Sequence, residues 1–143
     1  MNYIRQVEIR WSDLDPNYHV RHSAYYDFGA YCRLAFLNDH GITPEVMLSH
    51  SLGPVLFREE CVFKREINFG DRVSIYLTLR QASPDFRKWT MVHELWKNET
   101  TLAAVITVDG AWMNTQQRKI IAPPDIFKTA FEAIPKSDDF KII

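Results

Sequence analysis

The stretch AYYDFGAYCRLAFL, residues 24 to 37, carries only two charges, Asp27 and Arg33, and is apolar on nearly every face at the helical period. Ser23 before it is a good helix N-cap, and Gly41 after it is a good C-terminal cap. A helix that is apolar all round is normally buried on all sides. A chain of 143 residues has few ways to surround a helix, and a curled sheet is one of them. The sequence therefore predicts a long central helix wrapped by a sheet.

The segments around this helix have the pattern of strands and turns. Residues 3 to 11 mix apolar and charged positions and end at the turn residues Pro16 and Asn17. Thr43 and Pro44 begin a short second helix, with Thr as the cap and Pro at the first helical position. Four consecutive strands follow from about Gly53, within residues 54–67, 72–80, 87–96 and 101–114. This order predicts an α+β fold in a single domain spanning residues 1–143, with a tail from about residue 123.

Composition excludes several classes of function. Hydrophobic residues make up 46% of the chain and charged residues 24%, which is typical of a globular domain. The net charge of -1 argues against nucleic acid or an anionic membrane as the partner. The N-terminus lacks the apolar stretch of a secretory signal, and no segment is apolar enough to span a bilayer. We therefore expect a cytoplasmic protein whose two cysteines, Cys32 and Cys61, are free thiols.

The usual catalytic motifs are missing from the chain. It has no GxSxG elbow, no glycine-rich phosphate loop and no paired-cysteine zinc site. His19 and His22 are three residues apart, but two ligands in a loop are weak grounds for a metal site. We expect neither a metal nor another cofactor.

The segment DLDPNYHVRHSAYYDFGAYCR, residues 13 to 33, resembles the signature of hotdog-fold acyl thioesterases. The matching positions are Asp13 and Asp15 two apart, His19-Val20, Tyr25 five residues beyond Val20, and a long helix. The acyl-carrier-protein thioesterases of plants and the 4-hydroxybenzoyl-CoA thioesterase group carry versions of this signature. The resemblance covers roughly residues 3 to 122. It implies a hotdog fold, in which a curled antiparallel sheet wraps one central helix, and edge-to-edge homodimers that pair into homotetramers.

The resemblance also implies roles for single residues. Asp15 matches the catalytic carboxylate, which either attacks the thioester carbonyl or activates a water, and both roles stay open. Backbone N–H groups around Gly53 are the implied donors to the developing oxyanion, and the resemblance implies that they face Asp15 of the partner chain across the dimer interface, whereas Asp13 is expected to brace the loop. The candidate substrate-binding residues are His19, Arg21, His22, Tyr25 and Gly53. Each of three residues also has a purely structural alternative. His19 would hold the loop, Arg21 would be a solvated surface residue, and Tyr25 would belong to the core.

Four positions depart from the family pattern. Arg21-His22 stands where Asn-Asn is common, Tyr18 where glycine is common, and Ala30 where an acidic residue is frequent. The resemblance implies hydrolysis of an acyl thioester, with acyl-CoA as the substrate and an acyl carrier protein as the alternative carrier. The rival functions are a non-catalytic acyl-thioester binder and an enoyl-CoA hydratase; the Asp-to-His spacing fits the second poorly.

Overall fold

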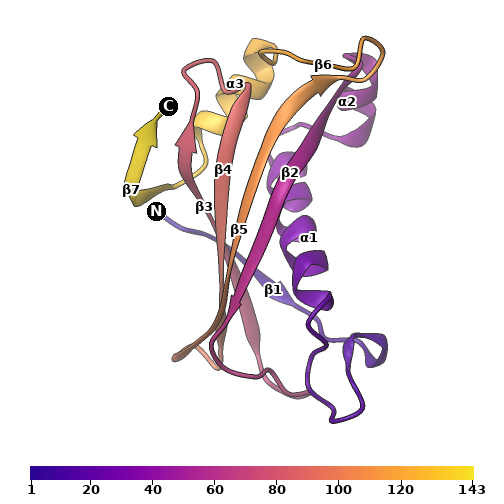
Figure 1. Cartoon of the computed structure of the whole chain (residues 1–143), viewed down its shortest axis with the longest axis vertical. Helices are drawn as coiled ribbons and strands as arrows, with labels where there is room; N and C mark the ends of the chain where they lie inside the picture. Colours follow the sequence, from indigo (N-terminus) through magenta and orange to yellow (C-terminus); the bar gives the residue numbers. More distant parts are fainter.

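Seven strands form one curled sheet, seen in the computed structural model of residues 1–143 (Figure 1). Its main path is β1-β3-β4-β5-β2, and all of these neighbours are antiparallel. The strands of this path are β1 (Tyr3–Val7), β2 (Leu52–Phe63), β3 (Val73–Ala82), β4 (Lys88–Lys97) and β5 (Thr101–Asn114). Two short strands lie off the path: β6 (Lys119–Ile120) pairs with β5, and β7 (Lys136–Ile142) runs parallel to β3. This α+β architecture with a half-open curled sheet is the hotdog fold expected from the sequence.

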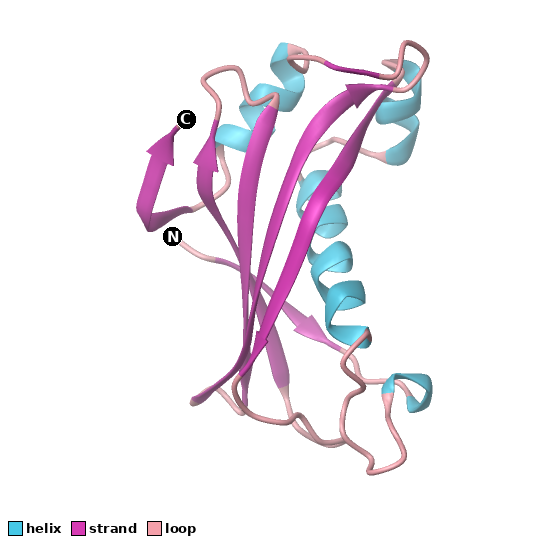
Figure 2. Cartoon of the chain, in the orientation of Figure 1, coloured by secondary structure: helices cyan, strands magenta, loops and turns pink.

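The long helix α1 (Ala24–Asp39) lies along the concave face of the sheet (Figure 2). It ends before Gly41, which has a φ of +81°, and the Gly41 N–H donates to the carbonyl of Asn38 at 3.1 Å. The predicted second helix, α2 (Pro44–Ser49), is also confirmed, because the Thr43 hydroxyl accepts a hydrogen bond from the Val46 N–H at 3.2 Å. No helix of the chain combines the length and the apolar character needed to cross a membrane.

The core lies between α1 and the concave face of the sheet. Alternate residues of β3 are buried, as the period of two predicts: Val73, Ile75, Leu77 and Leu79. Helix α1 contributes Phe36, which is 2% exposed and whose burial stabilises the fold by about 1.5–3 kcal/mol. Cys32 is buried and Cys61 is half-buried, and both are free thiols, as predicted.

The structure corrects one expectation about α1, namely that it is buried on all sides. Tyr31 and Leu34 are 53% and 46% exposed, and Ala30 is also exposed. The sheet curls only far enough to cover one side of the helix, so the opposite side faces outward in the single chain. That side is apolar nevertheless, which explains why the sequence alone indicates full burial.

The segment after residue 123, expected as a tail, folds into helix α3 (Asp125–Glu132) and strand β7. Phe127, Phe131 and Ile134 are at most 1% exposed. The ring of Phe127 lies 5.1 Å from that of Trp112 in an edge-on contact. Apolar residues at positions 127, 130, 131 and 134 form one helical face, and this period makes α3 part of the core.

Strand β2 forms an open edge of the sheet. Phe57 is 60%, Val62 is 47% and Phe63 is 51% exposed along it. The pairing with β5 skips Phe57, which is the extra residue of a β-bulge between Leu56 and Arg58. A long edge with exposed apolar side chains on both sides of the charged residues Arg58, Glu59 and Glu60 is a template for pairing with another strand.

Candidate active site

Asp13 holds the loop between β1 and α1. Its side chain is fully buried and accepts hydrogen bonds from the Arg10 guanidinium at 2.9 Å and from the Arg10 backbone N–H at 2.9 Å. The hydrogen bonds from the Arg10 side chain hold the pKa of Asp13 below its usual range. The carbonyl of Asp13 also accepts from the Arg21 N–H at 2.7 Å. The bracing role expected for Asp13 is therefore confirmed.

Asp15 begins the turn that follows. Its Oδ1 accepts hydrogen bonds from the backbone N–H groups of Asn17, at 2.8 Å, and His19, at 3.1 Å. The backbone closes the same turn, because the Asp15 N–H donates to the His19 carbonyl at 2.8 Å. Tyr18 sits in the left-handed region with a φ of +64°, which explains why glycine suits that position. The turn thus orients the Asp15 carboxylate through one oxygen and leaves Oδ2 with no protein donor.

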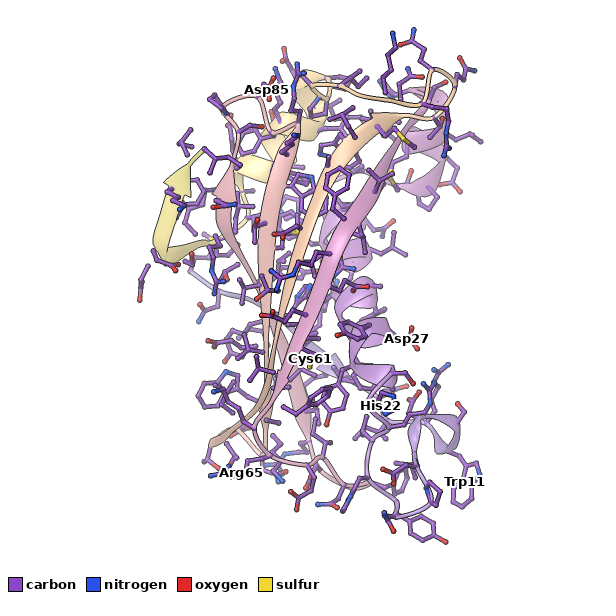
Figure 3. The ribbon with its side chains drawn as sticks, viewed as in Figure 1. Trp11, His22, Asp27, Cys61, Arg65 and Asp85 are labelled. Atoms are coloured by element: carbon purple, nitrogen blue, oxygen red, sulfur yellow. The ribbon has the colours of Figure 1, made fainter.

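A hollow of about 370 Å³ opens in front of Asp15. Its lining comes from two segments, residues 15–25 and residues 63–66, and backbone contacts hold these segments together. The Val20 N–H donates to the Ile67 carbonyl at 2.8 Å, and His19 forms a β-bridge with Asn68. The residues that line it are Asp15, His19, Val20, His22, Tyr25, Phe63, Lys64, Arg65 and Glu66. Figure 3 shows His22 at the foot of α1, at the same end of the molecule as Arg65. The structure therefore brings together four residues that the sequence selected.

Tyr25 belongs to both the core and the hollow. It is 3% exposed, and its ring meets that of Phe63 edge-on at 4.9 Å. Burial raises the pKa of Tyr25 to about 12, and the nearby Cys61, Glu66 and Asp15 act in the same direction. The hydroxyl therefore keeps its proton at neutral pH and remains a hydrogen-bond donor.

The N-terminus of α1 is uncapped at the rim of this hollow. Ser23 makes no capping hydrogen bond, because its hydroxyl accepts from the Arg21 guanidinium instead. The backbone N–H groups of His22, Ser23, Tyr25 and Tyr26 donate to no acceptor in the chain. Free N–H groups and the positive end of the helix dipole favour negative charge here. The resemblance pointed to Gly53 instead, although Ser23 at the helix start was already visible in the sequence.

Two of the predicted site residues, Arg21 and Gly53, do not line the hollow. Arg21 donates through Nε to the Ser12 carbonyl at 2.9 Å, so its guanidinium ties the loop to the helix start. Gly53 lies near the start of β2, roughly 33 Å along an extended strand from Phe63. It follows the C-terminal end of α2, where the helix dipole is negative. Within one chain Gly53 therefore does not meet Asp15.

Two basic residues of the hollow, Lys64 and Arg65, were not selected from the sequence. They follow β2 directly and are exposed, and both also line an adjoining surface depression beside Thr100. Two adjacent basic residues in a chain with balanced charge do not indicate a binding site in the sequence. Only the fold shows that they lie in the same hollow as Asp15. No group of three or more His, Cys, Asp or Glu side chains is arranged to hold a metal ion.

A family model described as the thioesterase-like superfamily matches residues 9–131 of the chain. The fold is similar to that of a Staphylococcus aureus protein solved in complex with CoA, with a TM-score of 0.84, 19% identity and coverage of 92% of this chain and 82% of that one. It is also similar to a 1,4-dihydroxy-2-naphthoyl-CoA thioesterase from Synechocystis, with a TM-score of 0.82, 18% identity and coverage of 93% and 97%. A DHNA-CoA thioesterase from Staphylococcus aureus matches with a TM-score of 0.81, 15% identity and coverage of 92% and 89%. No curated protein sequence matches the chain.

Proposed function

The chain belongs to the thioesterase-like superfamily, and from this premise we propose that it hydrolyses an acyl thioester of coenzyme A. One observation carries the proposal: a carboxylate with a free oxygen, Asp15, shares a hollow with the uncapped N-terminus of α1. A carboxylate can start the reaction, and free helix N–H groups can stabilise the oxyanion that forms.

The free Oδ2 of Asp15 can start hydrolysis of the thioester in two ways. As a general base it takes a proton from water, the hydroxide adds to the thioester carbonyl, and the thiolate leaves and is protonated. As a nucleophile it adds to the carbonyl itself, expels the thiolate and forms a mixed anhydride, which water then splits into the acid and the free carboxylate. Both routes pass through a tetrahedral oxyanion. The free N–H groups of His22 and Ser23 are the donors that we assign to it, because His22 lines the same hollow and Ser23 follows it at the start of α1.

The charged lining of the hollow consists of two carboxylates, Asp15 and Glu66, and two adjacent cations, and the cationic pair is what supports coenzyme A as the proposed carrier. Lys64 and Arg65 place two cations at its edge, where phosphate groups of the carrier would meet them. His19 and His22 offer further polar contacts. An acyl carrier protein is the alternative carrier and would present its own phosphate group to the same pair.

We further propose that two chains pair through the β2 edge into a homodimer, and that dimers pair into a tetramer. The exposed Phe57, Val62 and Phe63 support this arrangement, since pairing would remove them from water. In an antiparallel pair the Phe63 end of one strand lies beside the Gly53 end of the other. Gly53 of the partner chain would then approach the Asp15 hollow, which is the one way in which it could contribute to the site.

The test is Asp15→Asn, assayed by thiol release from a panel of acyl-CoA and acyl-carrier-protein thioesters. The amide oxygen of asparagine can still accept from the Asn17 and His19 N–H groups, so the turn and the stability should persist. Turnover should fall by roughly a hundredfold or more, because the amide is neither base nor nucleophile.

The matched control is Asp27→Asn, which makes the same chemical change on an exposed residue outside the hollow and should leave turnover unchanged. Activity of Asp15→Asn within threefold of wild type would remove Asp15 from the mechanism. A wild-type protein that binds acyl thioesters but releases no thiol from any of them would instead be the non-catalytic binder.

A further inference from the structure

The long helix α1 starts differently from the other two α-helices of the chain. Thr43 before α2 and Pro124 before α3 have extended backbones, with ψ angles of 165° and 164°. A residue that caps a helix normally has this conformation, and the Thr43 hydroxyl accordingly accepts the Val46 N–H. Ser23 before α1 instead has a helical backbone, with φ of -73° and ψ of -22°, and its side chain caps nothing. Serine is among the best capping residues, so a specific contact is expected to hold it out of that role.

Arg21 makes this contact. Its guanidinium donates to the Ser23 hydroxyl, which is the oxygen that could otherwise accept a helix N–H. The carbonyl of Arg21 accepts the Ala24 N–H at 3.0 Å, so a hydrogen-bonded turn that contains His22 and Ser23 precedes α1. A guanidinium has five N–H donors and no acceptor, so the Arg21 side chain cannot cap this turn itself.

Arg21 is held on its other side by the loop in front of α1. Its backbone N–H donates to the Asp13 carbonyl at 2.7 Å, and its Nε donates to the Ser12 carbonyl at 2.9 Å. The buried Asp13 carboxylate lies 4.0 Å from the guanidinium. The Asp27 carboxylate is 3.9 Å away but 64% exposed, so it adds little. These contacts hold the guanidinium between the loop that carries Asp15 and the start of α1.

The open turn has a cost and a use. A cap like that of Thr43 stabilises a helix, and the chain forgoes this stabilisation at α1. In exchange, the backbone N–H groups of His22 and Ser23 have no acceptor in the chain. Unpaired donors at a helix start favour negative charge, and a thioester carbonyl under attack becomes an oxyanion that needs such donors.

We propose that Arg21 is a positioning residue of the proposed active site: by holding the Ser23 hydroxyl, it keeps the N–H groups of His22 and Ser23 free for the oxyanion. The inference rests on the proposed function, which supplies the oxyanion. Arg21 does not line the hollow and acts only through Ser23. Without its guanidinium, Ser23 would adopt the extended conformation of Thr43, and its hydroxyl would accept the Tyr26 N–H. The turn that carries the two donors would then unwind.

The test is a double-mutant cycle of Arg21→Met and Ser23→Ala, assayed by thiol release from the thioester panel. Methionine is a long side chain without an N–H donor. In the wild-type background Arg21→Met should lower kcat at least about tenfold and change KM little, because the donors act on the oxyanion rather than on bound substrate. In the Ser23→Ala background the same change should lower kcat less than about threefold, since alanine has no hydroxyl with which to cap.

The matched control is Arg72→Met, which makes the same change on an exposed arginine outside the hollow and should leave kcat unchanged. A second readout does not depend on catalysis. The Cα and Cβ NMR shifts of Ser23 should be helical in wild type and extended in Arg21→Met. The Tyr26 amide should exchange with solvent at least about tenfold more slowly in Arg21→Met, because a cap protects it. Loss of a merely structural arginine would not slow the exchange of any amide.

An equal fall of kcat in both backgrounds, or helical Ser23 shifts in Arg21→Met, would overturn the proposal. These outcomes are distinct from failure of the proposed function. Asp15→Asn should keep the helical Ser23 shifts, because the hydrogen bonds of Asp15 involve only residues 17 to 19. A wild-type protein without thioester turnover would refute the proposed function and, with it, the role of the two donors. Turnover with equal effects of Arg21→Met in both backgrounds would refute the role of Arg21 alone.

Discussion

Acidification should destabilise the fold through His93, a fully buried residue of β4 that contacts Arg33 of α1. Burial lowers the pKa of His93 from 6.5 to about 3, and the adjacent Arg33 charge acts in the same direction. The folded chain therefore keeps this imidazole neutral, with its Nε2 lone pair accepting from Arg33. The unfolded chain protonates the same residue near its ordinary pKa.

The sign and size of the effect follow from this difference. The stabilisation is fully present above pH 6.5 and is lost as the pH falls toward 3, because only the unfolded chain takes up the proton. The slope is about 1.4 kcal/mol per pH unit, so His93 alone should reduce the free energy of unfolding by about 2 kcal/mol between pH 7.5 and pH 5. Carboxylates such as Asp13, whose pKa lies below 3.8, act at lower pH.

Urea unfolding at pH 7.5 and pH 5, at one protein concentration, measures this loss. The comparison variant is His93→Gln, whose amide oxygen can still accept from Arg33 but does not titrate. The free energy of unfolding of this variant can be lower at both pH values. Its decrease from pH 7.5 to pH 5 should be smaller than the decrease in wild type by about 2 kcal/mol. Equal losses in the two proteins would refute the conclusion that His93 is held neutral.

Three further predictions concern assembly and packing. Light scattering at micromolar concentration should give at least a dimer mass, and a monomer mass would contradict pairing through β2. Gly53→Val should fold, since a β-carbon there meets only Thr115 at 3.5 Å. Turnover near that of wild type would exclude Gly53 from the active site. An inactive variant whose activity returns on co-refolding with Asp15→Asn would place Gly53 across the dimer interface from Asp15. Gly110→Ala should lower the unfolding free energy by roughly 1–3 kcal/mol in a urea titration, because its β-carbon would lie 2.3 Å from the Trp89 ring; Gly53→Ala is the control and should change little.

Local sequence patterns were enough to predict much of this fold. The period of β3, the Thr43-Pro44 helix start and the Gly41 cap each depend on neighbours in sequence, and all three are present in the structure. The apolar stretch of α1 also predicted a helix against a curled sheet correctly. The motif from Asp13 to Tyr25 contains most of the residues that line the candidate hollow, because one tight turn and one helix start hold those residues together.

Long-range contacts decided the rest, and no local pattern encodes them. How far the sheet curls determines that one side of α1 stays exposed. The return of the chain past β2 brings Lys64 and Arg65 to Asp15, and the length of that strand keeps Gly53 away. The cavity beside α1 requires Arg33, Trp89 and Trp112 to converge from a helix and two strands. The sequence by itself determined most of the elements and the turn at Asp15, whereas only tertiary packing decided which charged groups lie together, because that depends on residues far apart in the chain.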